Sequence, residues 1–94
     1  MTNPLFLDAK DQVILKSILK TIPNAIYVYG SRVKGTAKPF SDIDLYIEGD
    51  ITDEQLSQLI TQCDESDLSI KVDLTNKLGP DFLKAIQADF VRFK

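Results

Sequence analysis

Residues 29–47 read YGSRVKGTAKPFSDIDLYI, and this stretch decides the fold. The β-branched and aromatic run 25–29 predicts a strand that breaks at Gly30 and Ser31. An alternating strand then resumes at Asp42 and Asp44. A strand that ends in glycine and leads into a helix exposes backbone N–H groups, which can bind phosphate oxygens. The same two residues also fit a plain strand-to-helix turn.

The rest of the chain alternates between helical and strand patterns. Asp8 is placed to cap the first helix, Thr52 and Gln55 have the spacing of a capping box, and Pro80 suits a first helical turn. The expected helices span residues 8–22, 32–35, 52–63 and 80–93, and the expected strands span residues 25–29, 42–48 and 68–74. This order predicts one α/β domain over residues 1–94, with a small mixed sheet covered on one face by helices.

Three aspartates are expected on the other face of that sheet. Asp42 and Asp44 stand two residues apart, so they project from the same side of one strand, and Asp73 joins them if its strand pairs with theirs. Three neighbouring carboxylates repel each other unless a counter-charge is present. Two magnesium ions roughly 4 Å apart supply that charge in enzymes of phosphoryl transfer. The alternative is a half-solvated sheet face that is merely acidic.

Composition excludes several classes of chemistry. The chain has no histidine and one cysteine, so Ser-His-Asp triads, ordinary zinc sites and internal disulfides are excluded. Cys63 falls on the apolar side of its predicted helix, where a packing thiol is expected. A metal site must then use carboxylates, which favour Mg²⁺, Mn²⁺ or Ca²⁺.

The net charge and the hydropathy of the chain limit which partners and which cellular location we expect. The formal net charge of -3 argues against a long nucleic-acid footprint, although Arg32, Lys34 and Lys38 form a local basic segment. No signal sequence or membrane-length apolar run is recognised, so we expect a cytoplasmic protein with no membrane association. Arg32 and Lys34 are either phosphate contacts or solvated surface charges.

Taken together, these motifs resemble the DNA polymerase beta-type nucleotidyltransferase superfamily. Its signature is a Gly-Ser pair, about ten intervening residues, an Asp-x-Asp on a strand and a third acidic residue on a later strand. Gly30 and Ser31, ten further residues, Asp42 and Asp44, and then Asp73 match it. The resemblance covers residues 25–75 well and implies the palm fold of that superfamily.

The resemblance also implies a role for each metal-binding position. Asp42 and Asp44 would bind both of two Mg²⁺ ions, with Mn²⁺ as the alternative metal. Asp73 would bind the catalytic ion and assist deprotonation of the acceptor hydroxyl.

On the nucleotide side, the resemblance implies that Gly30 and Ser31 hold the triphosphate of ATP or another nucleoside triphosphate. Arg32 and Lys34 would be further phosphate contacts. The rings of Tyr27, Tyr29 and Tyr46 fit core, surface or base-stacking positions equally well, so the sequence leaves the base-binding residues open.

The short chain is similar to the minimal nucleotidyltransferases, single catalytic domains often paired with a small helical HEPN protein. This similarity implies an antitoxin that transfers AMP from ATP to a tyrosine of its HEPN toxin partner. Two alternatives stay open at this point. One is a non-catalytic module that neutralises a partner by contact, and the other is a nucleotidyltransferase that modifies an antibiotic, for which a homo-oligomer could complete the acceptor site.

Overall fold

The computed structural model describes residues 8–30 and 42–94. The predicted short helix at residues 32–35 lies outside these residues. The elements in chain order are α1 (Ala9–Leu19), β1 (Ile26–Tyr29), β2 (Ile43–Ile47), α3 (Asp53–Asp64), β3 (Val72–Thr75), α4 (Pro80–Ile86), the 3₁₀ helix η1 (Gln87–Asp89) and β4 (Val91–Arg92). None of the helices in the described ranges is long and apolar enough to cross a membrane.

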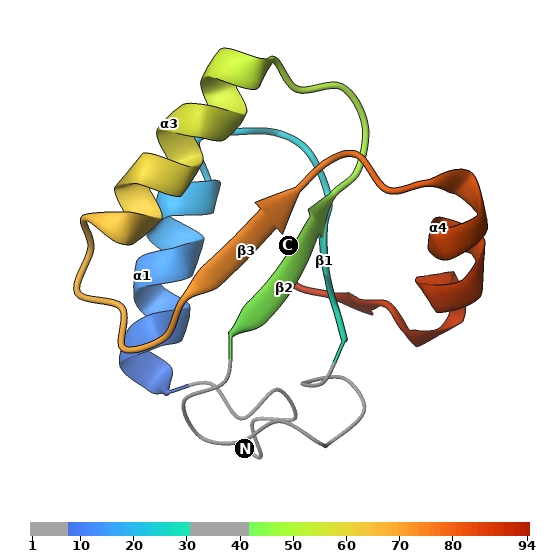
Figure 1. Cartoon of the computed structure of the whole chain (residues 1–94). Helices are drawn as coiled ribbons and strands as arrows, with labels where there is room; N and C mark the ends of the chain where they lie inside the picture. Colours follow the sequence, from blue (N-terminus) through green and yellow to red (C-terminus); the bar gives the residue numbers. More distant parts are fainter. Residues whose placement is uncertain (1–7, 31–41) are drawn as a thin grey trace.

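The described strands form one mixed sheet in the order β3-β2-β1-β4. β1 is antiparallel to both of its neighbours, whereas β2 and β3 are parallel. Parallel strands need a crossover connection, and α3 provides it between β2 and β3. Figure 1 shows α1 and α3 packed together on one side of the sheet, with α4 on the side away from them. The predicted α/β architecture is therefore confirmed.

The core lies between the sheet and the pair α1 and α3. Alternate residues of each strand point into it, because side chains of a strand alternate between its two faces. Its buried members are Leu15, Leu19, Ile22, Ile26, Val28, Ile43, Leu45, Ile47, Leu59, Cys63, Ile70, Val72 and Leu74. The expected burial of Cys63 is confirmed, and burial, followed by the nearby Asp64 carboxylate, raises the pKa of its thiol to about 11.

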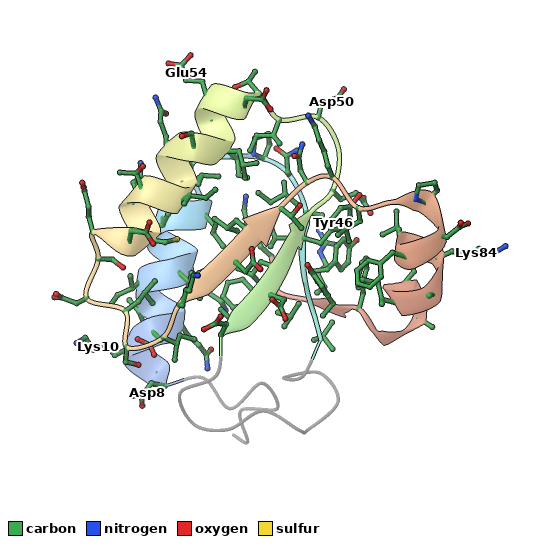
Figure 2. All side chains as sticks on the ribbon, in the orientation of Figure 1. Asp8, Lys10, Tyr46, Asp50, Glu54 and Lys84 are labelled. Atoms are coloured by element: carbon green, nitrogen blue, oxygen red, sulfur yellow. The ribbon has the colours of Figure 1, made fainter. Side chains whose placement is uncertain are left out.

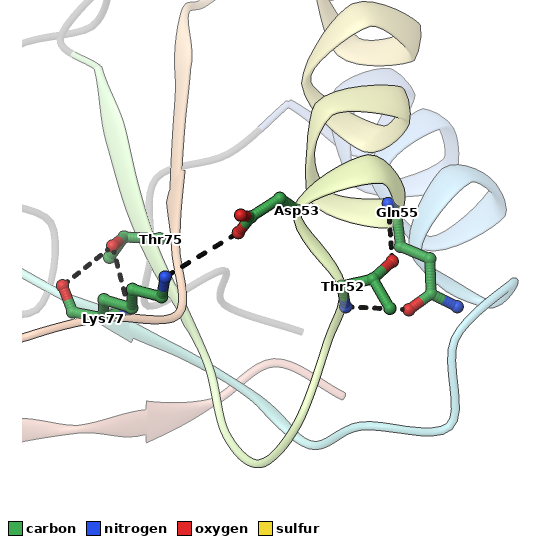
Figure 3. A network of polar contacts seen from close by, with 5 residues as sticks. All are labelled: Thr52, Asp53, Gln55, Thr75 and Lys77. Carbon is green, nitrogen blue, oxygen red and sulfur yellow. Dashed lines mark hydrogen bonds and ion pairs between the residues drawn. The ribbon is translucent and has the colours of Figure 1, made fainter.

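The start of α3 matches the predicted capping box. The Thr52 hydroxyl accepts a hydrogen bond from the Gln55 N–H at 3.0 Å, and the Gln55 side chain accepts one from the Thr52 N–H at 3.1 Å (Figure 3). The same view shows Lys77, beyond β3, reaching Asp53 at 3.7 Å. Both of those side chains are highly exposed, so the ion pair contributes little to stability.

Two predictions about the first helix, its end and its cap, need correction. α1 ends at Leu19 rather than at residue 22, and a turn follows it. Asp8 stands at the N-cap, but its side chain makes no capping hydrogen bond. A neighbouring acid, Asp11, is instead buried, and its carboxylate accepts hydrogen bonds from the Ser69 N–H at 3.1 Å and the Ser69 hydroxyl at 2.5 Å.

The last two expected elements are also different. The strand predicted at 68–74 occupies Val72–Thr75, because Asp11 takes the hydrogen-bond donors of Ser69. The helix predicted at 80–93 begins at Pro80 as expected but ends at Ile86. Val91 and Arg92 instead pair with Val28 and Tyr27 of β1 as strand β4. This pairing covers a strand edge that would otherwise leave its N–H and C=O groups open.

Replacement of Thr52 by alanine should lower the free energy of unfolding by about 1 kcal/mol, since it removes the side-chain acceptor of the capping box. Thr61→Ala is the control, because Thr61 is exposed further along α3 and has no capping role. Urea unfolding of the three proteins measures the difference. An equal effect of both changes would show that the capping box does not stabilise α3.

Candidate functional site

The candidate site lies on the sheet face that α1 and α3 leave uncovered. Ile43, Leu45 and Ile47 of β2 are buried in the core. Asp44 therefore projects from the opposite face, where it is half-buried, and Asp42 is exposed just before the strand begins. The alternation predicted for this segment is confirmed.

Strand register brings the carboxylates of β2 and β3 to neighbouring positions. Asp44 is the Cα partner of Asp73 in the parallel ladder, and on the other side it is the Cα partner of Tyr29 in β1. Partners across a ladder present their side chains on the same face of a sheet. The expectation that Asp73 joins the β2 aspartates is thus met for position, while the roles of the three residues stay predictions.

The electrostatic environment of Asp44 includes the charges of the other two carboxylates. Burial raises the pKa of the Asp44 carboxyl, and the charges of Asp73 and Asp42 raise it further. Burial, followed by the charges of Asp44 and Asp73, also raises the pKa of the Tyr29 hydroxyl. In residues 8–30 and 42–94 the one ion pair is Lys77 with Asp53, so no basic side chain of these ranges pairs with the three acids.

The donor chemistry suits a hard divalent cation. Carboxylate oxygens are the ligands that Mg²⁺ and Mn²⁺ prefer, and a cation would relieve the repulsion that raises the pKa of Asp44. Within the described part of the chain, no three acidic or cysteine side chains are already gathered around one point. The carboxylates of Asp42 and Asp73 are therefore close enough to affect the charge of Asp44, but the three side chains do not already surround one metal position.

Gly30 ends β1 directly beside this group. Its backbone has a φ of +84°, and a Cβ added there would lie 2.6 Å from Oδ2 of Asp44. Glycine is thus required both by the backbone conformation and by the closeness of the Asp44 carboxylate. The other predicted phosphate-binding residues, Ser31, Arg32 and Lys34, lie outside the described residues.

Aromatic side chains lie beside the carboxylates on the same face. The Phe90 ring packs against Tyr27 and Tyr46 at centroid distances of 5.3 and 5.6 Å, and against Tyr29 at 6.1 Å. Phe82 of α4 meets Tyr29 in a T-shaped contact at 6.4 Å. We call these five residues the aromatic surface.

The sequence analysis missed this surface, because it predicts one continuous helix over residues 80–93 and so does not bring Phe90 against the strands. Figure 2 shows Tyr46 between the sheet and α4, with Lys84 on the far side of that helix. A signal was present in the alternation of Tyr27 and Tyr29 with the core residues of β1. This alternation indicated that the sheet face away from α1 and α3 carries aromatic side chains as well as acidic ones.

Comparisons with known proteins identify the family of this chain. A family model described as "Polymerase beta, Nucleotidyltransferase" matches residues 13–89. A Haemophilus influenzae protein named "Probable protein adenylyltransferase MntA" is 37% identical over 102 residues, which cover 97% of this chain and 87% of that protein. A crystal structure titled as a nucleotidyltransferase candidate from Sulfolobus solfataricus has a TM-score of 0.47 and 15% identity, and the match covers 98% of this chain and 87% of the other.

Gly30→Ala should destabilise the protein more than Gly49→Ala does. Both positions have a positive φ, which costs alanine roughly 1–2 kcal/mol. An added Cβ at Gly49 meets only Asn24 Nδ2 at 3.4 Å, whereas at Gly30 it meets Asp44 Oδ2 at 2.6 Å. The excess loss of unfolding free energy at Gly30, measured with urea, therefore reports the contact with Asp44. Equal losses would show that the Asp44 carboxylate moves aside without cost.

Asp44→Asn should stabilise the metal-free protein at neutral pH. The raised pKa means that the folded state holds the Asp44 proton to higher pH than the unfolded state does. The stability of the parent protein should then fall as pH rises from about 4, the usual unfolded value, through the raised folded pKa. The Asn variant should lack this fall, and Asp50→Asn, an exposed change in the turn after β2, should retain it.

Thermal unfolding between pH 4 and 8 in a chelating buffer measures these differences. Added Mg²⁺ should raise the melting temperature of the parent protein more than that of Asp44→Asn, because a ligand stabilises only the state that binds it. Identical pH profiles for the parent and Asp44→Asn would contradict the proposed repulsion.

Proposed function

Since the chain belongs to the polymerase beta nucleotidyltransferase family and is a nucleotidyltransferase, we propose that it transfers AMP from ATP to a tyrosine hydroxyl of a partner protein. We further propose that this partner is a HEPN-type helical toxin and that the chain is its antitoxin. ATP is a cytoplasmic metabolite, and we place the reaction in the cytoplasm.

One observation carries the proposal. Asp44 is the ladder partner of Asp73, Asp42 adds its charge two residues away, and Gly30 lies against the Asp44 carboxylate. This arrangement sets the Asp44 carboxylate directly against the backbone of Gly30, where the absence of a side chain allows the close approach. It suits a triphosphate that is bound together with divalent cations.

The carboxylates would hold the metal. Asp42 and Asp44 are the proposed ligands of two Mg²⁺ ions, or of Mn²⁺ in their place, and Asp73 is a proposed ligand of the catalytic ion. Such ions, when bound, lower the pKa of an attacking hydroxyl and stabilise a phosphate leaving group.

The remaining groups would position ATP and the acceptor. Gly30 and Ser31 are the proposed triphosphate contacts, with Arg32 and Lys34 as further contacts. The tyrosine oxygen attacks the α-phosphorus, the bond from that phosphorus to the bridging oxygen breaks, and pyrophosphate leaves with the electron pair. Asp73 assists removal of the hydroxyl proton, which passes to solvent.

Two observations support a protein as the acceptor. The Haemophilus influenzae relative is named as a protein adenylyltransferase. The net charge of -3 does not favour a long polyanion such as RNA or DNA. The assignment of the acceptor to a tyrosine of a HEPN protein follows from the sequence resemblance to minimal nucleotidyltransferases.

The test uses ATP labelled at the α-phosphate, Mg²⁺, the purified protein and a lysate of the source cells. We expect a labelled protein band that disappears with a chelator and in the Asp42→Asn/Asp44→Asn double variant, with a loss of at least about 100-fold. Asp50→Asn is the matched control, since it removes an exposed aspartate outside the site and should leave labelling unchanged. Mass spectrometry of the band then identifies the acceptor residue.

Label on a nucleic acid or a small molecule would reject the protein acceptor. Absence of label above the double variant, with equal capture of a partner by both proteins, would reject catalysis and favour inhibition by contact alone.

A further inference from the structure

Phe82 is an aromatic ring that the fold leaves half in solvent. Its side chain is 51% exposed, and the other large apolar side chains of the described ranges that are comparably exposed, Val13 and Ile60, are aliphatic and belong to α1 and α3. Phe82 lies in α4, which has no buried residue of its own. Its position is therefore not explained by the core.

Contacts hold this ring at the edge of the aromatic surface. The planes of Phe82 and Tyr29 are at 80° with a centroid distance of 6.4 Å, which is the preferred edge-to-face arrangement. Tyr29 in turn packs on Phe90 at 6.1 Å and is half-buried. The Phe82 ring thus contacts Tyr29 on one side, and the rest of the ring is exposed to solvent.

The same contacts connect Phe82 to the carboxylates. Tyr29 is the ladder partner of Asp44, and Asp44 is the ladder partner of Asp73. Phe82 is therefore one aromatic ring away from the strand position where phosphates and metal would bind. In a nucleotide, one ribose separates the α-phosphate from the base. A nucleotide whose phosphates lie at the carboxylates can therefore extend past Tyr29 and place its base on Phe82.

We propose that Phe82 is the base-stacking residue of the nucleotide site and that Tyr29 positions its ring. This inference rests on the proposed function, because it takes the triphosphate to bind at the carboxylates. Stacking accepts every base, since each has a π-face. Purine nucleotides, with their larger rings, should bind more tightly than pyrimidine nucleotides with the same phosphates.

Tryptophan fluorescence offers a direct test, because the chain contains no tryptophan. In Phe82→Trp the single indole replaces the stacking ring and should be quenched when Mg²⁺-ATP binds. Mg²⁺-tripolyphosphate, which has the phosphates and no base, should bind without this quenching. Val13→Trp is the control, because Val13 is 69% exposed on α1, on the far side of the sheet, and its indole should not respond to either ligand.

A second measurement does not depend on a probe. Phe82→Leu keeps an apolar side chain and removes the ring, and its exposed position makes the change tolerable for folding. Calorimetry should show ATP binding weakened roughly 5- to 30-fold in this variant, while tripolyphosphate binding stays as in the parent. Phe82→Tyr should retain parental affinity for both.

The outcomes separate this inference from the proposed function. The stacking role would be overturned if ATP binds the parent protein and Phe82→Leu with equal affinity and the fluorescence of Phe82→Trp does not change on binding. That result would leave the proposed nucleotidyl transfer intact. Unchanged ATP affinity with loss of acceptor labelling in Phe82→Leu would assign the ring to the acceptor protein instead. Failure of the parent protein to bind either ligand would overturn both proposals.

Discussion

The parallel pairing of β2 with β3 sets two like charges against each other, and the rest of the structure accommodates this pair. Asp44 and Asp73 are direct ladder partners, a placement that destabilises a sheet in the absence of a counter-charge. Burial and the Asp42 charge add to the unfavourable field at Asp44. A fold that places its acids in this way gives up stability at a position where a bound cation would restore it.

The stability that offsets this repulsion comes from the opposite face of the sheet. All core residues of β1, β2 and β3 point toward α1 and α3, so the carboxylate face carries none of the main core. The buried Asp11 strengthens this side, because its carboxylate joins α1 to the segment that leads into β3. The packed core and the carboxylates are thus separated onto two faces of the sheet by the alternation of its side chains.

Local patterns predicted the parts of the fold that depend on neighbours in sequence. The strand expected at 42–48 is β2 at Ile43–Ile47, and the helix expected at 52–63 is α3 at Asp53–Asp64. The strand pattern also predicts that Asp73 lies beside Asp44 if its strand pairs with β2, and the register shows this pairing. In each case residue spacing within a short window, or a known motif, carried the information.

The misses at residues 68–74 and 80–93 arise from contacts between distant segments. The alternation of residues 68–74 predicts a strand, but Asp11 binds the donors of Ser69, which shortens it. Phe82 and Phe90 have helical spacing, yet Phe90 packs on Tyr27 and the following residues pair with β1. The closeness of Gly30 to the Asp44 carboxylate likewise depends on strand pairing and not on sequence spacing.

The crossover through α3 has a further consequence for how the site comes into being. Asp44 and Asp73 are 29 positions apart along the chain (73 minus 44), and they become neighbours only when the parallel ladder closes around that helix. Closing such a ladder requires long-range contacts, which form late and slowly compared with local ones. A chain that has formed α1, β1 and β2 alone therefore has no paired carboxylates. Assembly of the acidic pair coincides with the pairing of β3 to β2, so partly folded molecules without that pairing lack it.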